Sequence, residues 1–350
     1  MIRLKRKMKA ALLYKALDMR FEEVDAPEIK PDEALVGVKC VGICGSDVHY
    51  YIHGRIASFV VEKPLILGHE CAGEILEVGD EVHDLKVGQR VVIEPGFTCG
   101  KCYYCREGRY NLCREVQFYA TPPVHGAFAE FVSAPVENVY PLPNNMTYEE
   151  GAMIEPLAVG MMAAKRGSVT VDDTVAILGA GPIGQMILQA VKARGCLETY
   201  MTDIVDYRLE FAEKFGATNV INSTREDAVK RILELTDNEG VDIAIEAAGA
   251  VSAIKQAFDI VRPGGRSVLV GLYPFVEFQV PLANAITKEL DIYGVWRYAN
   301  VFPTAIRCVS SGRINIKPLI THKFPFDRIM EAFETHIKKI ENPMKIEILI

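Results

Sequence analysis

The segment VAILGAGPIGQMILQAVKARG, residues 175–195, constrains the fold more than any other part of this sequence. The apolar run Val175–Leu178 predicts a buried strand, and an apolar-periodic helix follows to about Arg194. Three glycines, Gly179, Gly181 and Gly184, separate the two elements. A strand, a GxGxxG turn and a helix in this order predict a dinucleotide-binding βαβ unit.

Each glycine has a physical role in such a unit. Gly179 allows the tight turn, Gly181 lets backbone amides reach a pyrophosphate at the helix N-terminus, and Gly184 lets helix and strand pack closely. The next strand, ETYMTD, ends at Asp203. An acid there accepts hydrogen bonds from the ribose hydroxyls and repels a 2′-phosphate, so NAD is favoured over NADP. Two alternatives stay open: Asp203 could cap the following helix, and Arg208 could accommodate NADP.

The alternation of strands and helices continues as far as RSVLVGL, residues 266–272, with a turn predicted at RPGG. This pattern predicts a doubly wound parallel sheet. In contrast, residues 8–126 show short, β-branched runs punctuated by Gly and Pro, which predict a β-rich domain with many turns. After residue 281 the pattern becomes mixed, and we expect this C-terminal part to return to the first domain.

The chain of 350 residues is long enough for two domains, and 49% of its residues are apolar. Its net charge is -7 and the sequence has no basic stripe, so we expect no binding to nucleic acid. The N-terminal segment is basic and then apolar, but Lys15 and Asp18 soon interrupt it, which argues against a signal peptide. No apolar run approaches transmembrane length, so we expect a cytoplasmic protein with no membrane partner.

Four cysteines, Cys99, Cys102, Cys105 and Cys113, lie in one loop-like segment, CGKCYYCREGRYNLC. Thiolates at this spacing can close the tetrahedron of one Zn²⁺ ion. Because a closed site does no chemistry, we predict a structural zinc that stabilises a lobe. Four reduced surface thiols or a disulfide pair are the alternatives.

A second set of metal ligands is spread over three short motifs. Cys44, His69 and Glu70, with Glu155 in reserve, offer one thiolate, one imidazole and carboxylates, a mixture that suits Zn²⁺. Adjacent residues of an extended segment point apart, so His69 and Glu70 need a sharp bend, which Gly68 permits. The alternative is a buried structural histidine beside a glutamate.

With these residues in place, the chain resembles the zinc-dependent medium-chain dehydrogenases, and among them the polyol dehydrogenases of sorbitol and xylitol. The resemblance covers nearly the whole chain. GHE and GAGPIG are shared across the superfamily, whereas SDVHY, EPLAVG and the RY of GVWRYAN are more selective. HGRI, GRYNLC, ATPP, TD and VGL also carry it.

The resemblance implies a protein of class α/β and β. A GroES-like catalytic domain would contain residues 1–156 and 291–350, and an inserted NAD-binding Rossmann domain would contain residues 157–290. It places a catalytic zinc on Cys44, His69 and Glu70, with Glu155 as the fourth ligand or as the residue that holds the metal-bound water. Alcohol dehydrogenases of the superfamily use a cysteine where the polyol branch uses a carboxylate. The resemblance further implies a structural zinc in the lobe with four cysteines and a homotetramer.

The resemblance also implies two sets of binding residues. The polyol site would be lined by Tyr50, Phe118, Glu155, Arg297 and Tyr298. NAD would be held, in addition to the glycine turn, by Ile183, Asp203, Arg208, Val270, Gly271, Leu272, Val295, Trp296 and Arg297. Each has another interpretation: Tyr50 and Phe118 could be core aromatics, and Arg297 could belong to a surface ion pair.

The expected activity is therefore oxidation of a secondary hydroxyl of a polyol to a ketose, with hydride transfer to NAD. We expect zinc to lower the pKa of the hydroxyl, and its proton to leave through Ser46 and His49. Two alternatives remain. One is the same chemistry on another small alcohol, 2,3-butanediol or L-threonine, and the other is a non-catalytic relative that binds NAD.

Overall fold

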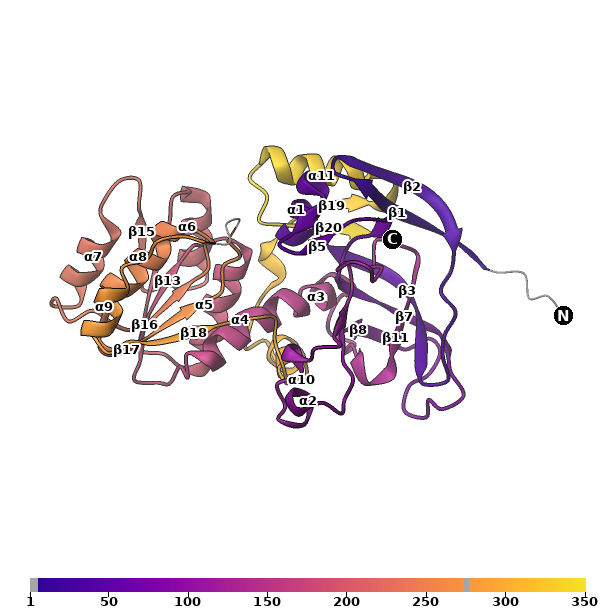
Figure 1. Ribbon diagram of the computed structural model, residues 1–350, viewed down its shortest axis with the longest axis horizontal. Coiled ribbons are helices and arrows are strands. Elements are labelled where there is room, and N and C mark those ends of the chain that lie inside the picture. Colours follow the sequence, from indigo (N-terminus) through magenta and orange to yellow (C-terminus); the bar gives the residue numbers. More distant parts are fainter. Residues whose placement is uncertain (1–5, 274–276) are drawn as a thin grey trace. The chain divides into compact units, whose positions relative to one another are not determined.

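The computed structural model describes residues 6–273 and 277–350, which form two compact units (Figure 1). The first unit contains the described residues up to Glu155, together with Phe302–Ser311 and Ile316–Ile350. The second contains Pro156–Val301 and Gly312–Asn315. Both ends of the chain therefore contribute to the first unit.

A seven-stranded sheet forms the frame of the first unit. Its order is β12-β8-β7-β3-β20-β19, and β11 also pairs with β3. Near its end, β3 has β7 antiparallel on one side and the C-terminal strand β20 antiparallel on the other. The strands are β3 (Glu33–Gly42), β7 (Glu70–Val78), β8 (Arg90–Ile93), β11 (Phe131–Pro135), β12 (Val139–Pro141), β19 (Ile320–Pro325) and β20 (Lys345–Leu349).

Smaller elements complete this unit. A three-stranded sheet has the order β2-β1-β6, and two further pairs are β4–β5 and β9–β10. These strands are β1 (Lys7–Lys15), β2 (Asp18–Asp25), β4 (Arg55–Ile56), β5 (Phe59–Val60), β6 (Leu65–Ile66), β9 (Gly96–Phe97) and β10 (Gln117–Phe118). The helices are α1 (Gly45–His53), α2 (Tyr103–Arg106), α3 (Tyr148–Ala152), α10 (Phe302–Ser310) and α11 (Ile329–Lys338). Short 3₁₀ turns lie at Tyr110–Leu112, Val136–Asn138, Lys317–Leu319 and Phe326–Arg328.

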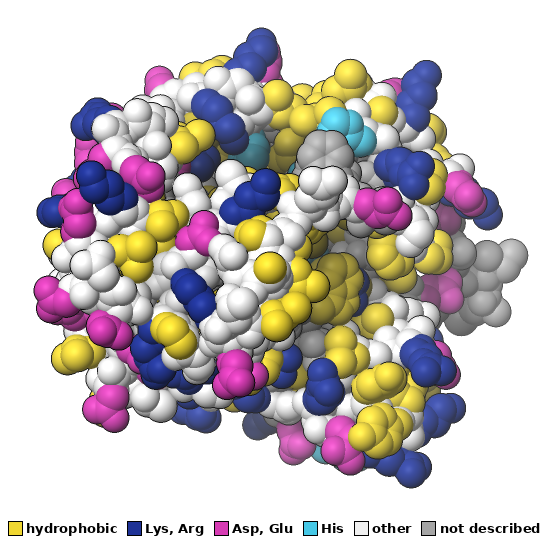
Figure 2. All heavy atoms as spheres, turned by 60° about the vertical axis from the view of Figure 1, so that its left-hand side comes forward, with side chains coloured by type: hydrophobic (Ala, Val, Ile, Leu, Met, Phe, Trp, Pro, Cys, Tyr) yellow, Lys and Arg dark blue, Asp and Glu magenta, His cyan; other side chains and the backbone are white. Residues whose placement is uncertain are grey.

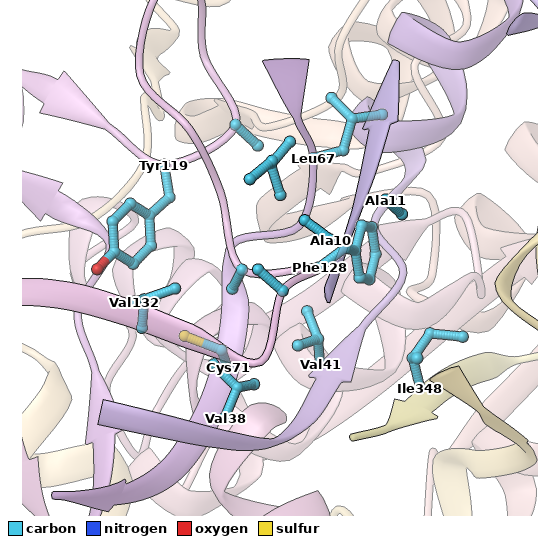
Figure 3. Packing of buried hydrophobic residues seen from close by; sticks show 14 of the residues in the cluster. Ala10, Ala11, Val38, Val41, Leu67, Cys71, Tyr119, Phe128, Val132 and Ile348 are labelled. Atoms are coloured by element: carbon cyan, nitrogen blue, oxygen red, sulfur yellow. The ribbon is translucent and has the colours of Figure 1, made fainter. Parts of the chain in front are cut away.

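The core of the first unit joins residues that are far apart in the sequence. Val41, Cys71, Phe128 and Ile348 are buried in one apolar cluster, and Figure 3 shows them close together. Cys71 follows Glu70 directly, and successive residues of a strand face opposite sides. Burial of Cys71 in this cluster therefore leaves Glu70 on the other face of β7.

The second unit is a six-stranded parallel sheet with helices on both faces (Figure 1). Its order is β15-β14-β13-β16-β17-β18. Residues of α4, α5 and α6 pack on one face, and residues of α7 and α8 pack on the other. The strands are β13 (Thr174–Leu178), β14 (Glu198–Asp203), β15 (Asn219–Asn222), β16 (Val241–Glu246), β17 (Val261–Leu269) and β18 (Asp291–Gly294). The helices are α4 (Ile154–Arg166), α5 (Pro182–Arg194), α6 (Asp206–Lys214), α7 (Ala228–Leu235), α8 (Val251–Ile260) and α9 (Leu282–Thr287).

Two details of this sheet differ from the expectation. The predicted turn at RPGG is an irregularity inside β17, because Val261 and Arg266 both pair with β16 on either side of it. Moreover, β18 pairs in parallel with β17, so residues 291–294 belong to the sheet of the second unit. This unit therefore extends beyond residue 290, where we placed its end.

The surface carries charges of both signs. On the face drawn in Figure 2, Lys and Arg side chains are interspersed with Asp and Glu. Among the helices of the described residues, none has both the length and the apolar composition needed to cross a membrane.

Candidate active site and metal centres

The first candidate ligand, Cys44, lies at the start of a helix. β3 ends at Gly42, and Cys44 is the N-cap residue of α1. The backbone N–H of Cys44 donates to Asp47 Oδ2 at 2.9 Å. The carboxylate of Asp47 thus fixes the turn on which the Cys44 thiol lies.

The same carboxylate also fixes the segment that carries His69. Gly68 donates its backbone N–H to Asp47 Oδ1 at 2.9 Å, and Asp47 is fully buried. Gly68 has a φ of 86°, a left-handed conformation that glycine adopts without a steric penalty. The predicted bend is therefore present, and Asp47 connects the two ligand segments. The motif GSDVHY contains Asp47, but nothing in its spacing distinguished this residue from a surface helix-capping acid.

Cys44, His69 and Glu70 converge as expected for ligands of one ion. One ligand atom from each residue lies within 4.8 Å of the other two. His69 and Glu70 are both buried. Burial by itself would lower the pKa of His69, but the negative charges of Asp47 and Cys44 raise it well above its usual value. A divalent cation bound there would offset the negative charges of Asp47 and Cys44 around His69.

Glu70 is held by a cation that the sequence did not reveal. Its carboxylate forms an ion pair with Lys345 on β20, and both side chains are almost fully buried. The Lys345 ammonium also donates to the backbone carbonyl of Ile43 at 3.0 Å. Burial lowers the pKa of Lys345, but the charges of Glu70 and Cys44 outweigh this effect and raise it.

Glu155 lies in the first turn of α4 and is buried. Its charge contributes to the raised pKa of Lys345 and, after the effect of burial, to that of Cys71. Glu155 is therefore close to the cluster of Cys44, His69 and Glu70. Its place as fourth ligand, or as holder of a water molecule, stays a prediction.

Ser46 and His49 lie on α1 within two turns of Cys44. Their three-residue spacing places them on one face of the helix. The ring centroid of His49 is 5.7 Å from that of His53. Burial, and then the charge of His53, lowers the pKa of His49, so the imidazole is neutral at pH 7 and able to accept a proton.

The predicted substrate residues have different surroundings. Phe118 lies beside the ligand set, with its ring centroid 5.6 Å from that of His69. Tyr50 is buried in the apolar cluster of the first unit. Arg297 and Tyr298 belong to the second unit, where Arg297 stacks on Trp296 at 5.1 Å and has a φ of 55°. Their contact with substrate stays a prediction.

The four cysteines of the lobe also converge. The sulfur atoms of Cys99, Cys102, Cys105 and Cys113 all lie within 4.8 Å of one another. Two of the distances are 3.5 Å, from Cys102 to Cys105, and 3.6 Å, from Cys113 to Cys99. Four sulfurs at ~2.3 Å from one tetrahedral Zn²⁺ are ~3.8 Å apart. The cluster fits a zinc ion, and all four thiols are free of disulfides.

The lobe is anchored to the sheet through Glu94. Tyr110 from the lobe donates to Glu94 Oε1 at 2.7 Å, and Tyr140 donates to Glu94 Oε2 at 3.0 Å. Burial raises the pKa of Glu94, whereas these two hydrogen bonds lower it. The lobe therefore has a polar connection to the frame in addition to its metal ligands.

In the second unit, the glycine turn has the geometry that was predicted. Gly179 has a φ of 107°, and a Cβ on Gly184 would lie 1.8 Å from the carbonyl oxygen of Gly179. A Cβ on Gly181 would meet no atom within 4 Å, so the helix N-terminus is open there. Such a cradle fits the pyrophosphate of a dinucleotide.

Asp203 lies at the end of β14 beside this turn. Asp203 Oδ2 accepts from the N–H of Ala180 at 2.7 Å, and Arg208 Nη1 is 3.6 Å from the same oxygen. The N-cap of α6 is Val205, so Asp203 is not the helix cap that we considered as an alternative. Instead Asp203 Oδ1 accepts from the N–H of Val205 at 3.0 Å.

The other predicted NAD residues follow strand ends of the same sheet or begin a helix. Ile183 is in the first turn of α5, Val270–Leu272 follow β17, and Val295–Arg297 follow β18. Sequence reasoning missed Glu246, which is fully buried at the end of β16. Glu246 accepts from the N–H groups of Ala248, Gly249 and Gly271 and from the Tyr273 hydroxyl, so it connects two of these loops.

Comparisons with known proteins give the family. Residues 30–144 match the alcohol dehydrogenase GroES-like domain, and residues 182–311 match the zinc-binding dehydrogenase family. A sorbitol dehydrogenase from Bacillus subtilis is 44% identical over 339 residues, covering 97% of this chain and 96% of that protein. The chain belongs to the zinc-binding dehydrogenases. Membership in the zinc-binding dehydrogenases confirms the predicted family and fold class, and it confirms an enzyme that uses zinc.

Other zinc-binding dehydrogenases are similar over the same length. An L-idonate 5-dehydrogenase from Vitis vinifera is 41% identical over 332 residues, covering 93% of this chain and 90% of that protein. The crystal structure of 2R,3R-butanediol dehydrogenase from Bacillus subtilis has a TM-score of 0.89 and 32% identity. The match covers 98% of this chain and 99% of the butanediol dehydrogenase chain. The zinc-binding dehydrogenases similar to this chain therefore act on several different alcohols.

Proposed function

We propose that this protein is an NAD-dependent, zinc-dependent polyol dehydrogenase that oxidises a secondary hydroxyl of sorbitol or xylitol to the ketose. The observation that carries the proposal is the cluster of Cys44, His69 and Glu70, whose ligand atoms all lie within 4.8 Å. A carboxylate in place of a second thiolate is what the polyol branch of the family would have. The 44% identity to a sorbitol dehydrogenase supports the same substrate class.

Cys44, His69 and Glu70 would hold the catalytic zinc, with Glu155 as fourth ligand or as the holder of a water molecule. The donor set of sulfur, nitrogen and oxygen fits zinc. When bound, zinc supplies a Lewis acid that lowers the pKa of a hydroxyl. Cys99, Cys102, Cys105 and Cys113 would hold the structural zinc.

The chain itself would remove the proton of the reacting hydroxyl. Ser46 and His49 share a face of α1 close to Cys44. Because the pKa of His49 is lowered, its imidazole is in the neutral form that accepts a proton near pH 7. We propose that the Ser46 hydroxyl passes the proton to His49 and that His49 releases it to solvent.

NAD would bind at the carboxyl edge of the parallel sheet. The glycine turn would hold the pyrophosphate, and Asp203 would accept hydrogen bonds from the ribose. Arg208 lies 3.6 Å from the Asp203 carboxylate, and this pairing supports NAD over NADP because it engages the cation that a 2′-phosphate would need. Ile183, Val270–Leu272 and Val295–Arg297 would line the rest of the site.

The polyol would contact Tyr50, Phe118, Glu155, Arg297 and Tyr298. Arg297 has a left-handed backbone, which for a residue other than glycine costs on the order of 1–3 kcal/mol and is frequent at functional sites. The second candidate function is oxidation of a smaller alcohol such as 2,3-butanediol or L-threonine. The similarity to a butanediol dehydrogenase supports this candidate at a lower identity, 32%.

We also propose a cytoplasmic homotetramer in which segments from both ends of the chain form the catalytic domain. All nine cysteines are free, which suits a reducing compartment. β18 is an edge strand of its sheet, and Ile292 on it is 40% exposed, which supports association through this edge.

Metal analysis combined with an NAD reduction assay tests the proposal. The panel contains sorbitol, xylitol, 2,3-butanediol, L-threonine and 2-propanol. We expect a bound catalytic zinc and the highest kcat/KM with sorbitol or xylitol. A higher kcat/KM for butanediol or threonine would replace the polyol assignment with the second candidate. NAD binding without turnover of any substrate would establish a non-catalytic relative.

A further inference from the structure

The ion pair of Glu70 and Lys345 is among the most deeply buried charges in the first unit. The two side chains are 1% and 4% exposed. Two buried ions are expensive to remove from water, and their attraction compensates only when the geometry is good and other hydrogen bonds are satisfied. The second acceptor of the ammonium, the carbonyl of Ile43, lies in the segment between β3 and Cys44. Lys345 thus contacts Glu70, which is one candidate metal ligand. It also contacts the backbone of Ile43, which directly precedes Cys44, a second candidate ligand.

The arrangement of strands explains how two such distant residues meet. β3 lies between β7, which begins at Glu70, and β20, which begins at Lys345. Gly42 on β3 pairs with Glu70 on one side and with Glu347 on the other. A Cβ on Gly42 would lie 2.1 Å from Glu70 Oε2 and 2.9 Å from Lys345 Cε. Only a residue without a side chain lets Glu70 and Lys345 meet across β3.

We propose that Lys345 is a positioning residue for the catalytic zinc, holding Oε2 of Glu70 so that Oε1 is directed at the metal beside Cys44 and His69. This inference rests on the proposed catalytic site. A carboxylate can use its two oxygens for two partners, and Lys345 occupies one of them in the geometry described above. Hydrogen-bond partners of ligating carboxylates typically contribute 10–100-fold to metal affinity. Lys345 therefore acts through Glu70.

The test measures the zinc affinity of the full-length protein by competition with a chelator. The zinc of the four-cysteine lobe serves as an internal reference for correct folding. Lys345→Met should weaken zinc at the catalytic site by about 10–100-fold and leave the lobe zinc in place. The matched control is Lys323→Met on the neighbouring strand β19, which removes the ion pair of Lys323 with Glu149 of α3 and should leave both affinities unchanged. Unchanged or tighter catalytic zinc in Lys345→Met would overturn the proposal.

A double-mutant cycle shows whether Lys345 acts through Glu70. In a Glu70→Gln background, Lys345→Met should change zinc affinity by less than about twofold, because the interaction is already absent. An equal loss in both backgrounds would show a general structural role and contradict the proposal. Cobalt substitution adds a spectroscopic readout. The visible absorption of the Co²⁺ protein should change in Lys345→Met and should not change in Lys323→Met.

A second variant keeps both charges. Gly42→Ala places a methyl group where Glu70 Oε2 lies and should also weaken zinc binding at the catalytic site. This variant therefore tests the role of Lys345 even if Lys345→Met fails to fold. Cys44→Ser separates this inference from the proposed function. If Cys44→Ser retains both zinc ions, the proposed site is wrong. If it loses one while Lys345→Met and Gly42→Ala bind zinc normally, only the role of Lys345 is wrong.

Discussion

The two metal clusters of the first unit are built in opposite ways. In the four-cysteine lobe, Cys99 and Cys113 are only 14 positions apart, and the ligands come from one continuous segment. The cluster of Cys44, His69 and Glu70 takes its ligands from two segments, and the ion pair that supports it adds Lys345, which is 302 positions from Ile43. The lobe needs little beyond its own sulfur atoms, whereas the second cluster depends on buried charges, Asp47 and Lys345, that the fold brings to it. A metal site within one segment is thus determined by the spacing of its ligands in the sequence. A site built from distant segments is determined by the order of the strands in the sheet.

The largest effect should come from removing a ligand of the discontinuous cluster. Cys44→Ser should reduce kcat/KM for sorbitol by ~10³-fold or more, because Lewis-acid stabilisation is worth several kcal/mol. Metal analysis should fall from about two to about one zinc per chain, with the lobe zinc retained. Cys308→Ser, which changes a half-buried cysteine outside both clusters, serves as the control. Full activity in Cys44→Ser would disprove a catalytic zinc at this cluster.

The matching change in the lobe should affect stability. Cys102→Ser should lower the melting temperature by about 10 °C, because metal-binding free energy is folding free energy. Thermal unfolding followed by circular dichroism measures this, and Cys196→Ser is a matched cysteine control. If the melting temperature of Cys102→Ser equals that of the control, the lobe holds no structural zinc.

The third prediction concerns specificity. Arg297→Ala should lose about 10–100-fold in kcat/KM for sorbitol and little for 2-propanol, because unpaired polar groups cost about 1–3 kcal/mol. KM for NAD is measured in parallel, since Arg297 is also a predicted cofactor residue. Equal losses of kcat/KM for both alcohols would show that Arg297 does not recognise the hydroxyls of the polyol.

Asp203→Ala tests the nucleotide site. It should narrow the preference for NAD over NADP by about tenfold, since the acid both accepts ribose hydrogen bonds and repels a 2′-phosphate. The measurement is the ratio of kcat/KM for the two cofactors. Glu198→Ala, at the other end of the same strand, should leave the ratio unchanged. No change in Asp203→Ala would refute the assignment.

The smallest effect is a pH dependence near the discontinuous cluster. Burial raises the pKa of Glu347 from 4.5 to about 8, although a hydrogen bond from Cys40 and the charge of Lys345 lower it. The folded protein then binds more protons than the unfolded chain between these values, so the free energy of unfolding should fall as pH rises through about 8. Glu347→Gln should flatten this dependence and be more stable than the wild type at pH 9, by on the order of 1–2 kcal/mol. Urea titrations at pH 5, 7 and 9 would measure it, with exposed Glu77→Gln as control.

Much of the second unit could be predicted, because its signals are local. The strand ETYMTD matches β14, and the glycine turn has the expected conformation. The apolar spacing of TYEEGAMIEPLAVGMMAAKR predicts a helix. The structure has two helices there, because α3 ends at Ala152, with Met153 as its C-cap, and α4 begins at Ile154. The apolar periodicity continues across the break between the two helices, so the sequence pattern does not reveal it.

Lys345 shows why the rest could not be predicted. In KIEIL, polar and apolar residues alternate, a pattern typical of a strand with one face in solvent. In the structure Lys345 and Glu347 are buried, because β20 lies between β3 and β19 and its polar face meets Glu70 and Cys40. The alternation shows that the two faces of the strand differ in polarity, but it does not show which face is exposed to water.

The place of β20 has a consequence for biosynthesis. A ribosome completes the four cysteines of the lobe early, and that segment could capture zinc while most of the chain is still being made. Glu70 emerges earlier still, but its partner Lys345 lies 275 positions further along the chain (345 − 70). The catalytic cluster would therefore be completed much later than the four-cysteine lobe. The order of metal loading would then be set by the direction of translation, with the stabilising ion first and the catalytic ion last.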